Sequence, residues 1–411
     1  MNKIMGRIKF DKLKDKFNFK GYNSVCHHYL IFMSYFSFKI IGLLPWKMET
    51  GIFNKIQKVE NKNFKSNVSY VGSCYNILLV LVIVSLNIYI IYDILPVQVD
   101  FHLTLRIAQI KLSFVLLLCA SIIPLIYIFR QKLLINVLNR FENLDKKLNK
   151  CADYKAENNY TNYLIFTINF VVSVCIIIMR EIYYMSLKKV FIISFSYFIG
   201  SFVIIQYTML LNMIKTRFTN INSTLLRLGT SESKISLSRA SVLDDIGRIK
   251  RAYVELCEMS ENISNFYGFV MLIVIIVFVV RNLFNLYYAI LVLIHIEIVD
   301  IKIHICAVFF LWSSFLFTVL ATHVTKTVKQ NKKTARIINL LMDRYAADEK
   351  IKDKLAKFSS NLWHLTVEFT VCDLIPLDRT LLAMIAGTLA TYLVIAVQFR
   401  ISSFPNSLNS L

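Results

Sequence analysis

The sequence predicts an all-α polytopic membrane protein with seven transmembrane helices, an amino terminus in the cytoplasm and a carboxyl terminus outside the cell. Two features of the composition point to this fold class. Hydrophobic residues make up 56% of the 411 residues, above the roughly 45–50% of soluble domains, and they gather in long blocks. With only 10 glycines and 5 prolines, the chain has too few turn-forming residues for an all-β barrel or a flexible array of domains.

Seven apolar blocks are long enough to cross a bilayer. A helix needs about 20 apolar residues to span roughly 30 Å of hydrocarbon. Backbone groups in lipid must find hydrogen-bond partners within their own segment, so these spans are expected to be helices. The third block is the shortest. The blocks are residues 70–92, 107–129, 163–179, 190–213, 267–296, 305–323 and 377–399.

A lesser apolar stretch precedes the first span, at residues 29–46. Lys39, Gly42 and Pro45 interrupt it. Basic flanks and many aromatic residues suit the headgroup zone of a membrane. This stretch is therefore predicted to be an interfacial or half-inserted helix rather than an eighth span.

The positions of the basic residues set the orientation. Of the 47 Lys and Arg residues, 38 lie in residues 1–69, 130–162, 214–265 and 325–376. Basic loops stay in the cytoplasm, so the amino terminus is predicted to be inside and the carboxyl terminus outside. A G-protein-coupled receptor has the opposite orientation. Loops that face anionic lipid also account for the net charge of +21, so no nucleic-acid partner is expected.

Two apolar stripes lie in the predicted cytoplasmic segments, each just before a span. Their 3-4 spacing puts the apolar residues on one face of a helix and predicts helix packing outside the membrane. The stripes could pack within one subunit or join subunits, and spacing alone does not choose. They are Ile246, Ile249, Tyr253, Leu256, Ser260 and Ile263, and then Leu355, Phe358, Leu362, Leu365, Phe369 and Cys372.

The sequence gives little support for catalysis or transport. It contains no HExxH, GxSxG, Walker A or GxGxxG motif, so no enzyme activity, metal or cofactor is expected. Secondary transporters build ion sites from broken helices in paired repeats. Here the number of spans is odd, no repeat is visible, and no Asp or Glu lies deep within a predicted span.

The last span carries a signature. Thr391-Tyr392 is followed by five apolar residues and then by Gln398-Phe399. This pattern resembles the one that closes insect gustatory receptors. Upstream, the stretch Leu-Asp-Arg-Thr-Leu-Leu at residues 377–382 resembles the start of the same helix in that family. The match covers some 25 residues, and the remainder of the chain agrees in layout.

The resemblance implies a tastant-gated, non-selective cation channel in the plasma membrane of sensory neurons, assembled as a homotetramer or with related receptors. It further implies a cytoplasmic segment with an interfacial helix at 1–69, a six-helix bundle with a ligand pocket at 70–323, cytoplasmic anchor helices at 324–376, and a pore helix with a short outer tail at 377–411. Its partners would be a small-molecule tastant, permeating monovalent and divalent cations, and membrane lipid. An insect odorant receptor subunit and a secondary transporter remain the alternatives.

The resemblance makes the seventh helix the pore helix, with Gln398 and Phe399 at its outer end. A carboxamide offers both donor and acceptor groups to a partly dehydrated cation, and a ring of Phe399 could close a constriction by dewetting. Gln398 could instead simply mark the membrane boundary. Asp373 is expected to cap the helix that starts at Leu377, although an acid at the cytoplasmic mouth could also attract cations.

Polar and aromatic residues in the outer halves of spans two to six are the candidates for a ligand pocket. The most conspicuous is Arg281, near mid-span, which is expected to face a wet cavity or a partner because a charge facing lipid is costly. It could contact a ligand or serve as a structural residue bonded to helix carbonyls. Leu393 stands where sugar receptors of the family carry Glu, which leaves a bitter-type or fructose-type ligand. The candidates are Gln109, Ser194, Tyr197, Arg281, Asn285, Tyr288 and Trp312.

Overall fold

The computed structural model describes residues 33–49, 65–94, 101–149, 151, 160–184, 187–228, 239–294 and 301–403. Two antiparallel two-stranded ribbons are formed by β1 (Lys47–Glu49) with β2 (Lys65–Asn67), and β3 (Thr370–Val371) with β4 (Ile375–Pro376). The labelled helices are α3 (Tyr70–Ile94), α4 (Phe101–Phe129), α5 (Gln131–Leu148), α6 (Tyr160–Tyr184), α7 (Leu187–Leu228), α9 (Arg239–Ile294), α10 (Ile301–Arg344), α11 (Glu349–Leu362) and α12 (Arg379–Ser403).

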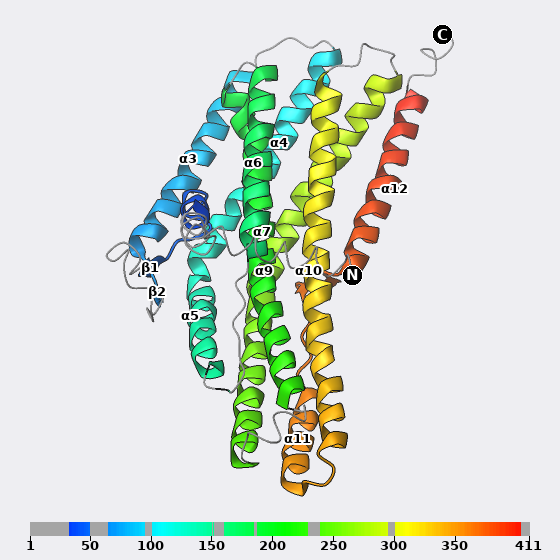
Figure 1. Ribbon diagram of the computed structural model, residues 1–411. Helices are drawn as coiled ribbons and strands as arrows, with labels where there is room; N and C mark the ends of the chain where they lie inside the picture. The colour runs from blue at the N-terminus through cyan, green and yellow to red at the C-terminus, as the bar shows by residue number, and fades with distance from the viewer. Residues whose placement is uncertain are drawn as a thin grey trace, which may run out of the picture.

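The long helices run alternately up and down a single elongated bundle (Figure 1). Helices α3, α6, α9 and α12 end at the upper end, and α4, α7 and α10 start there. Helices α5 and α11 lie at the lower end, beside the lower parts of α7, α9 and α10. Each of the seven predicted apolar blocks falls within one of these upright helices, apart from residues 295–296, which lie outside the described residues, and 377–378, which precede α12.

Not every apolar helix is long enough by itself to cross a membrane. In the described part of the chain, four helices are long and apolar enough, namely α7, α9, α10 and α12. The bent pair α4 and α5, which meet at 60°, makes a fifth candidate, and residues 70–86 and 164–179 form shorter apolar helices. The protein is therefore an all-helical, multi-pass membrane protein, and seven crossings stay a prediction.

Three helices extend far below their predicted spans. Helices α7, α9 and α10 contain 42, 56 and 44 residues, or roughly 60, 85 and 65 Å at 1.5 Å per residue. Their lower parts pack with α5 and α11 into a bundle that continues the upper one without a break (Figure 1). The predicted domain boundary at residues 323–324 lies inside the continuous helix α10, and the division into four domains stays a prediction.

The stripe on α9 and the first two residues of the second stripe are buried within one chain. All six residues of the stripe on α9 are at most 2% exposed. On α11, Leu355 and Phe358 are fully buried, and the Phe358 ring lies 5.7 Å from that of Tyr253 on α9. Of the two arrangements that the spacing allowed, packing within the subunit accounts for these positions.

The second stripe does not form one helix along its whole length. Helix α11 ends at Leu362, and Leu365, Phe369 and Cys372 lie beyond it. The physical reason is the β-branched run after Leu365, which disfavours a helix. The chain there becomes extended, and Val367, Phe369 and Val371 are buried while the residues between them are more exposed. The true period of this segment is two, and the 3-4 spacing was misleading.

The predicted cap of the last helix is also wrong. Helix α12 begins at Arg379, and Asp378 caps it by accepting hydrogen bonds from the backbone N–H of Thr380 at 2.8 Å and from its hydroxyl at 2.7 Å. Asp373 instead lies in the turn between β3 and β4, with φ at 58°, and accepts a hydrogen bond from the Thr370 hydroxyl at 3.0 Å. The turn leaves Asp373 too far from α12 to cap it.

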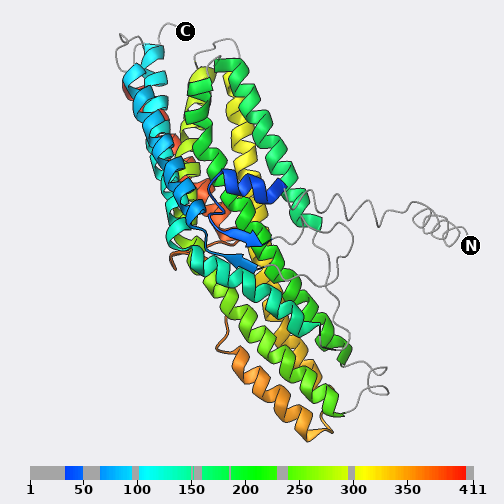
Figure 2. The same cartoon turned by 90° about the vertical axis from the view of Figure 1, so that its left-hand side faces the viewer.

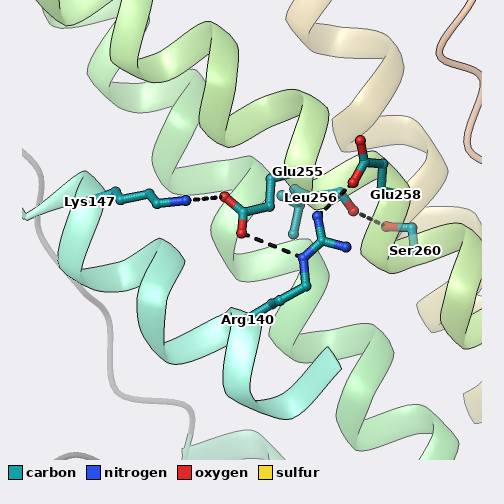
Figure 3. A network of polar contacts seen from close by, with 6 residues as sticks. All are labelled: Arg140, Lys147, Glu255, Leu256, Glu258 and Ser260. Carbon is teal, nitrogen blue, oxygen red and sulfur yellow. Dashed lines mark hydrogen bonds and ion pairs between the residues drawn. The ribbon is translucent and has the colours of Figure 1, made fainter. Parts of the chain in front are cut away.

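Charged side chains join α5 to α9 in the lower bundle (Figure 3). Glu255 accepts contacts from Lys147 at 2.7 Å and Arg140 at 3.5 Å, and Arg140 also reaches Glu258 at 2.6 Å. Such partly exposed pairs each contribute little to stability. Their value lies in fixing the register of α5 against α9, because one carboxylate receives cations from two turns of α5.

The amino-terminal segment packs across the bundle. Residues 33–40 form a helix that lies across the upright helices (Figure 2), and its place at the membrane interface stays a prediction. Gly42 then turns the chain with φ at +85°, a conformation that favours glycine. Its carbonyl accepts a hydrogen bond from the Asn76 side chain at 2.6 Å, and Trp46 beyond it is 1% exposed. Residues 29–32 of the predicted stretch lie outside the described residues.

The buried thiol of Cys257 is expected to be unreactive. Burial among the helices of the lower bundle raises its pKa to about 12, so almost none of it is thiolate at neutral pH. Cys372 is exposed on the β3–β4 turn. With N-ethylmaleimide at pH 7.5, followed by peptide mass spectrometry, Cys372 should be labelled in the folded protein and Cys257 only after denaturation. Equal labelling of both in the folded protein would contradict the packing of α9.

Candidate ligand site and pore helix

Aromatic side chains join α7, α9 and α10 in the upper part of the bundle. The Tyr197 ring stacks on Phe278 of α9 and meets Phe309 of α10 edge-on, with centroids 4.6 Å apart in both pairs. The closeness of α7 and α9 depends on Gly200, since a Cβ there would lie 2.5 Å from the Phe278 ring. These three rings, which we call the aromatic floor, lie just below a group of buried polar side chains on α9.

Polar side chains of α9 lie one to two turns above this floor, on the same helix face as Phe278. Arg281, Asn282 and Asn285 are 1%, 5% and 3% exposed. Asn282 donates a hydrogen bond to the Ser313 hydroxyl of α10 at 2.8 Å, and the Asn285 carbonyl oxygen lies 3.8 Å from the Cys306 sulfur. Among the described residues, the Asn285 amide nitrogen has no hydrogen-bond partner. A guanidinium and two carboxamides thus meet inside an apolar shell, a composition that suits a polar organic molecule.

A second polar cluster lies deeper in the bundle and joins four segments. The Gln206 side-chain oxygen on α7 accepts hydrogen bonds from the hydroxyls of Tyr127 at 2.5 Å and Tyr267 at 3.0 Å. The Gln206 amide donates to the carbonyl of Leu43 at 3.2 Å. Tyr207 stacks on Tyr267 with centroids 4.3 Å apart. This cluster, the Tyr–Gln cluster, ties α4, α7 and α9 to the amino-terminal turn.

The hairpin that leads into α12 rests on α9. The backbone N–H of Thr370 donates to the Ser264 hydroxyl at 3.3 Å, and a Cβ at Gly268 would lie 3.2 Å from the backbone nitrogen of Cys372. Phe369, just before the hairpin, meets the Tyr207 ring at 6.5 Å. The hairpin before α12 therefore lies directly against α9.

Helix α12 stands at the side of the bundle and is covered by little of the chain (Figure 1). Within its apolar stretch 11% of the residues are buried, against 83% for α7. Leu377 and Leu381 anchor its base at 0% and 2% exposure, whereas Tyr392 higher up is 56% exposed and Gln398 is exposed as well. An apolar helix with so little cover needs lipid or other protein surfaces against it.

Comparison with known proteins identifies the family. The sequence profile described as 7tm chemosensory receptor matches residues 31–403, which is most of the chain. The chain belongs to this chemosensory receptor family. The match runs from the amino-terminal turn through the last residue of α12, so it includes all the contacts described above.

Curated relatives of this chemosensory receptor come from Drosophila melanogaster. The protein named gustatory receptor 28b is 40% identical over 82 residues, which cover 20% of this chain and 17% of that protein. Gustatory receptor 28a is 30% identical over 106 residues, covering 25% and 23%. The chain thus matches only about a fifth of the length of each of these relatives.

Solved structures support the same fold. The chain is similar to the insect olfactory receptor OR5 from Machilis hrabei, with a TM-score of 0.62 and 10% identity over 91% of this chain and 99% of that one. For the complex of OR5 with eugenol the TM-score is 0.60 and the identity 11%, over 91% and 98%. At such low identity the likeness shows that the two receptors share a fold.

The structure brings some of the predicted pocket residues of this chemosensory receptor together. Tyr197, Arg281 and Asn285 are buried between α7, α9 and α10. Tyr288 and Trp312 are half-buried, and Trp312 stacks on Phe315 of its own helix at 5.1 Å. The side chains of Gln109, Ser194 and Phe399 lie outside the described residues.

Sequence reasoning missed several buried polar residues of the receptor. Asn282 and Ser313 complete the polar group around Asn285. Between α6 and α7, the amide of Asn169 and the hydroxyls of Ser173 and Ser196 are buried with no hydrogen-bond partner among the described residues. Asn169 and Ser173 are one turn apart on α6, a spacing that could have marked one polar face in an otherwise apolar helix.

Proposed function

We propose that this chemosensory receptor is a tastant-gated, non-selective cation channel of the plasma membrane, built from several copies of the chain around a pore lined by α12. The observation that carries the proposal is that most of the apolar surface of α12 is not buried by the rest of its own chain. Its apolar stretch is 11% buried in one chain, so other copies of the same helix are the natural cover for one face and lipid for the rest. The family resemblance suggests four copies.

The outer end of α12 supplies the proposed constriction. Gln398 is exposed on the chain, and a ring of carboxamides there would offer oxygen atoms to a partly dehydrated cation. Phe399 follows directly and would narrow the same level of the pore. The distribution of basic residues supports this orientation of α12 across the membrane. Of the 47 basic residues, 38 lie in segments at the proposed cytoplasmic end, which puts Gln398 near the outer surface.

The upper cluster of α7, α9 and α10 is the proposed tastant site. Arg281, Asn282 and Asn285 would hydrogen-bond the ligand, while Tyr197 and Phe309 would cover its apolar part. The unpartnered groups Asn169, Ser173 and Ser196 extend the polar lining toward α6. A ligand that binds better to the open form would shift the closed–open equilibrium toward opening.

Helix α9 is the proposed link between ligand and pore. Arg281 lies about 25 Å along the helix from Ser264, at 1.5 Å per residue, and both belong to one continuous helix. Ser264 and Gly268 contact the hairpin that leads into α12. A tilt of α9 upon ligand binding would therefore displace the base of α12 without any change within the helix.

The names of the Drosophila relatives favour a taste ligand over an odorant. Leu393 in place of the Glu of the sugar receptors favours a bitter-type or fructose-type compound. A secondary transporter is disfavoured by the lack of acidic residues deep in the spans.

Current recording in oocytes with a panel of sugars and plant alkaloids tests the proposal. An active compound should evoke inward cation current. The Asn285→Leu variant should then need at least tenfold more of the compound for half-maximal current, with an unchanged maximum, because one buried hydrogen bond is lost. The matched control is Asn339→Leu on the exposed lower part of α10, which should respond like wild type. Flux without channel-sized currents would indicate a transporter instead.

A further inference from the structure

The lower half of α10 carries a strongly positive exposed face. Lys326, Lys329, Lys333 and Arg336 are all exposed, and their 3-4-3 spacing puts all four on one side of the helix. We call these four residues the basic face. From Ile301 to Met342 the helix contains no Asp or Glu, so no acid within this stretch of α10 neutralises it.

This arrangement differs from several other exposed charges of the lower bundle. Basic side chains there are paired with acids in Arg140–Glu258 at 2.6 Å, Arg239–Asp348 at 2.5 Å and Arg248–Asp244 at 2.6 Å. Among the described ion pairs, none involves the basic face. Like charges three and four residues apart repel one another along a helix. An anionic partner bound to the basic face would reduce this repulsion.

The position of the basic face relative to the bilayer suggests the partner. The same side of α10 is apolar higher up, where Leu311 and Phe315 are 66% and 47% exposed. Lys326 follows the predicted span 305–323 by about 5 Å, and Arg336 lies about 15 Å further along. The upper basic residues thus lie at the level of the lipid headgroups, directly below a surface that suits acyl chains.

The direction of α10 adds to this match. Side chains of an α-helix lean toward its amino terminus, and α10 runs from the upper end of the bundle to the lower end (Figure 1). Long basic side chains on it therefore lean back toward the headgroups, which brings Lys333 and Arg336 within reach of a headgroup that projects from the surface. On the upward-running α9, the same side chains would lean away.

We propose that the basic face of α10 binds a polyvalent anionic phospholipid, of the phosphoinositide class, with its acyl chains along Leu311 and Phe315. A headgroup with several phosphates can contact more of the four cations than a headgroup with a single charge. The proposal rests on the orientation given above, with the lower bundle in the cytoplasm. It does not depend on which tastant opens the channel.

Binding of a fluorescent short-chain phosphatidylinositol bisphosphate to the purified full-length receptor in detergent tests the proposal. The triple variant Lys326→Gln/Lys329→Gln/Lys333→Gln should bind the probe at least tenfold more weakly than wild type. The matched control removes three exposed lysines from α11, as Lys350→Gln/Lys352→Gln/Lys357→Gln, and should bind like wild type. If both variants lose the same amount of affinity for the probe, the probe responds only to the net charge of the receptor, and the proposal is overturned.

Competition distinguishes the sources of phosphate. Inositol trisphosphate, which has the headgroup without acyl chains, should displace the probe only at much higher concentration, and phosphatidylserine should compete poorly. If the soluble headgroup competes as well as the lipid, the site binds free phosphates, and if phosphatidylserine does, it does not select polyvalent lipids. Either result contradicts the proposal. The proposal is also contradicted if the triple variant binds the probe as tightly as wild type. Tastant-evoked currents are measured separately, so failure here leaves the channel proposal standing.

Discussion

Replacing Gly72 with alanine is expected to destabilise the receptor by about 3 kcal/mol, the upper end of the cost of overpacking. Gly72 lies in the first turn of α3, against the amino-terminal segment. A Cβ at this position would overlap the backbone carbonyl of Pro45. A flexible side chain could move aside, but Pro45 is held by the turn at Gly42 and by Trp46, which is 1% exposed. The amino-terminal segment would have to leave the bundle.

The measurement is the fraction of receptor that stays monodisperse in fluorescence-detected size-exclusion chromatography after heating. The midpoint should fall by about 5–10 °C, given a few degrees per kcal/mol. Gly387→Ala is the matched control, because nothing lies within 4 Å of a Cβ there, and alanine favours a helix over glycine by about 1 kcal/mol. If both variants melt like wild type, the amino-terminal segment is not packed against α3.

The Gln206→Leu variant is expected to lose about 2–4 kcal/mol of stability, because it removes the partners of the Tyr267 hydroxyl and the Leu43 carbonyl and leaves the Tyr127 hydroxyl only the 3.5 Å contact with Tyr267. Gln206 accepts from the hydroxyls of Tyr127 and Tyr267 and donates to the carbonyl of Leu43. Each buried group left without a partner costs about 1–3 kcal/mol. Leucine fills nearly the same volume, so loss of packing adds little, and the effect reports on the hydrogen bonds.

A graded series separates this explanation from a general sensitivity of the core. Tyr127→Phe and Tyr267→Phe each remove one hydroxyl and leave Gln206 with another donor, so each should cost about 1 kcal/mol. Asn339→Leu makes a closely related chemical change at an exposed position of α10 and should not alter the melting midpoint. Similar losses from all three Tyr–Gln cluster variants would mean that the hydrogen bonds are not shared as described.

The sequence predicted those features of the receptor that depend on neighbouring residues. Long apolar blocks identified the upright helices, since hydropathy is a local property. The stripe on α9 was predicted to be one buried face, and its residues are buried. The spacing failed after Leu362, where local β-branched residues override a short helical pattern and the chain becomes extended.

Features that join distant parts of the chain could not be predicted in this way. The Tyr–Gln cluster brings together Leu43, Tyr127, Gln206 and Tyr267, and no local pattern connects four such separated residues. Arg281 could be singled out because a charge within a span is costly facing lipid. Its neighbours Asn282 and Ser313 bond only once α9 and α10 are packed together.

The central claim is that α12 is covered by copies of itself around a pore. Oxidative cross-linking of a Gln398→Cys variant in native membranes tests it most directly, since neighbouring copies at a constriction bring the thiols within disulfide range. Cross-linked oligomers should form with Gln398→Cys, and neither with wild type nor with Leu78→Cys on the exposed face of α3, where the side chain is 61% exposed. Cross-linking through Leu78→Cys with none through Gln398→Cys would contradict the account.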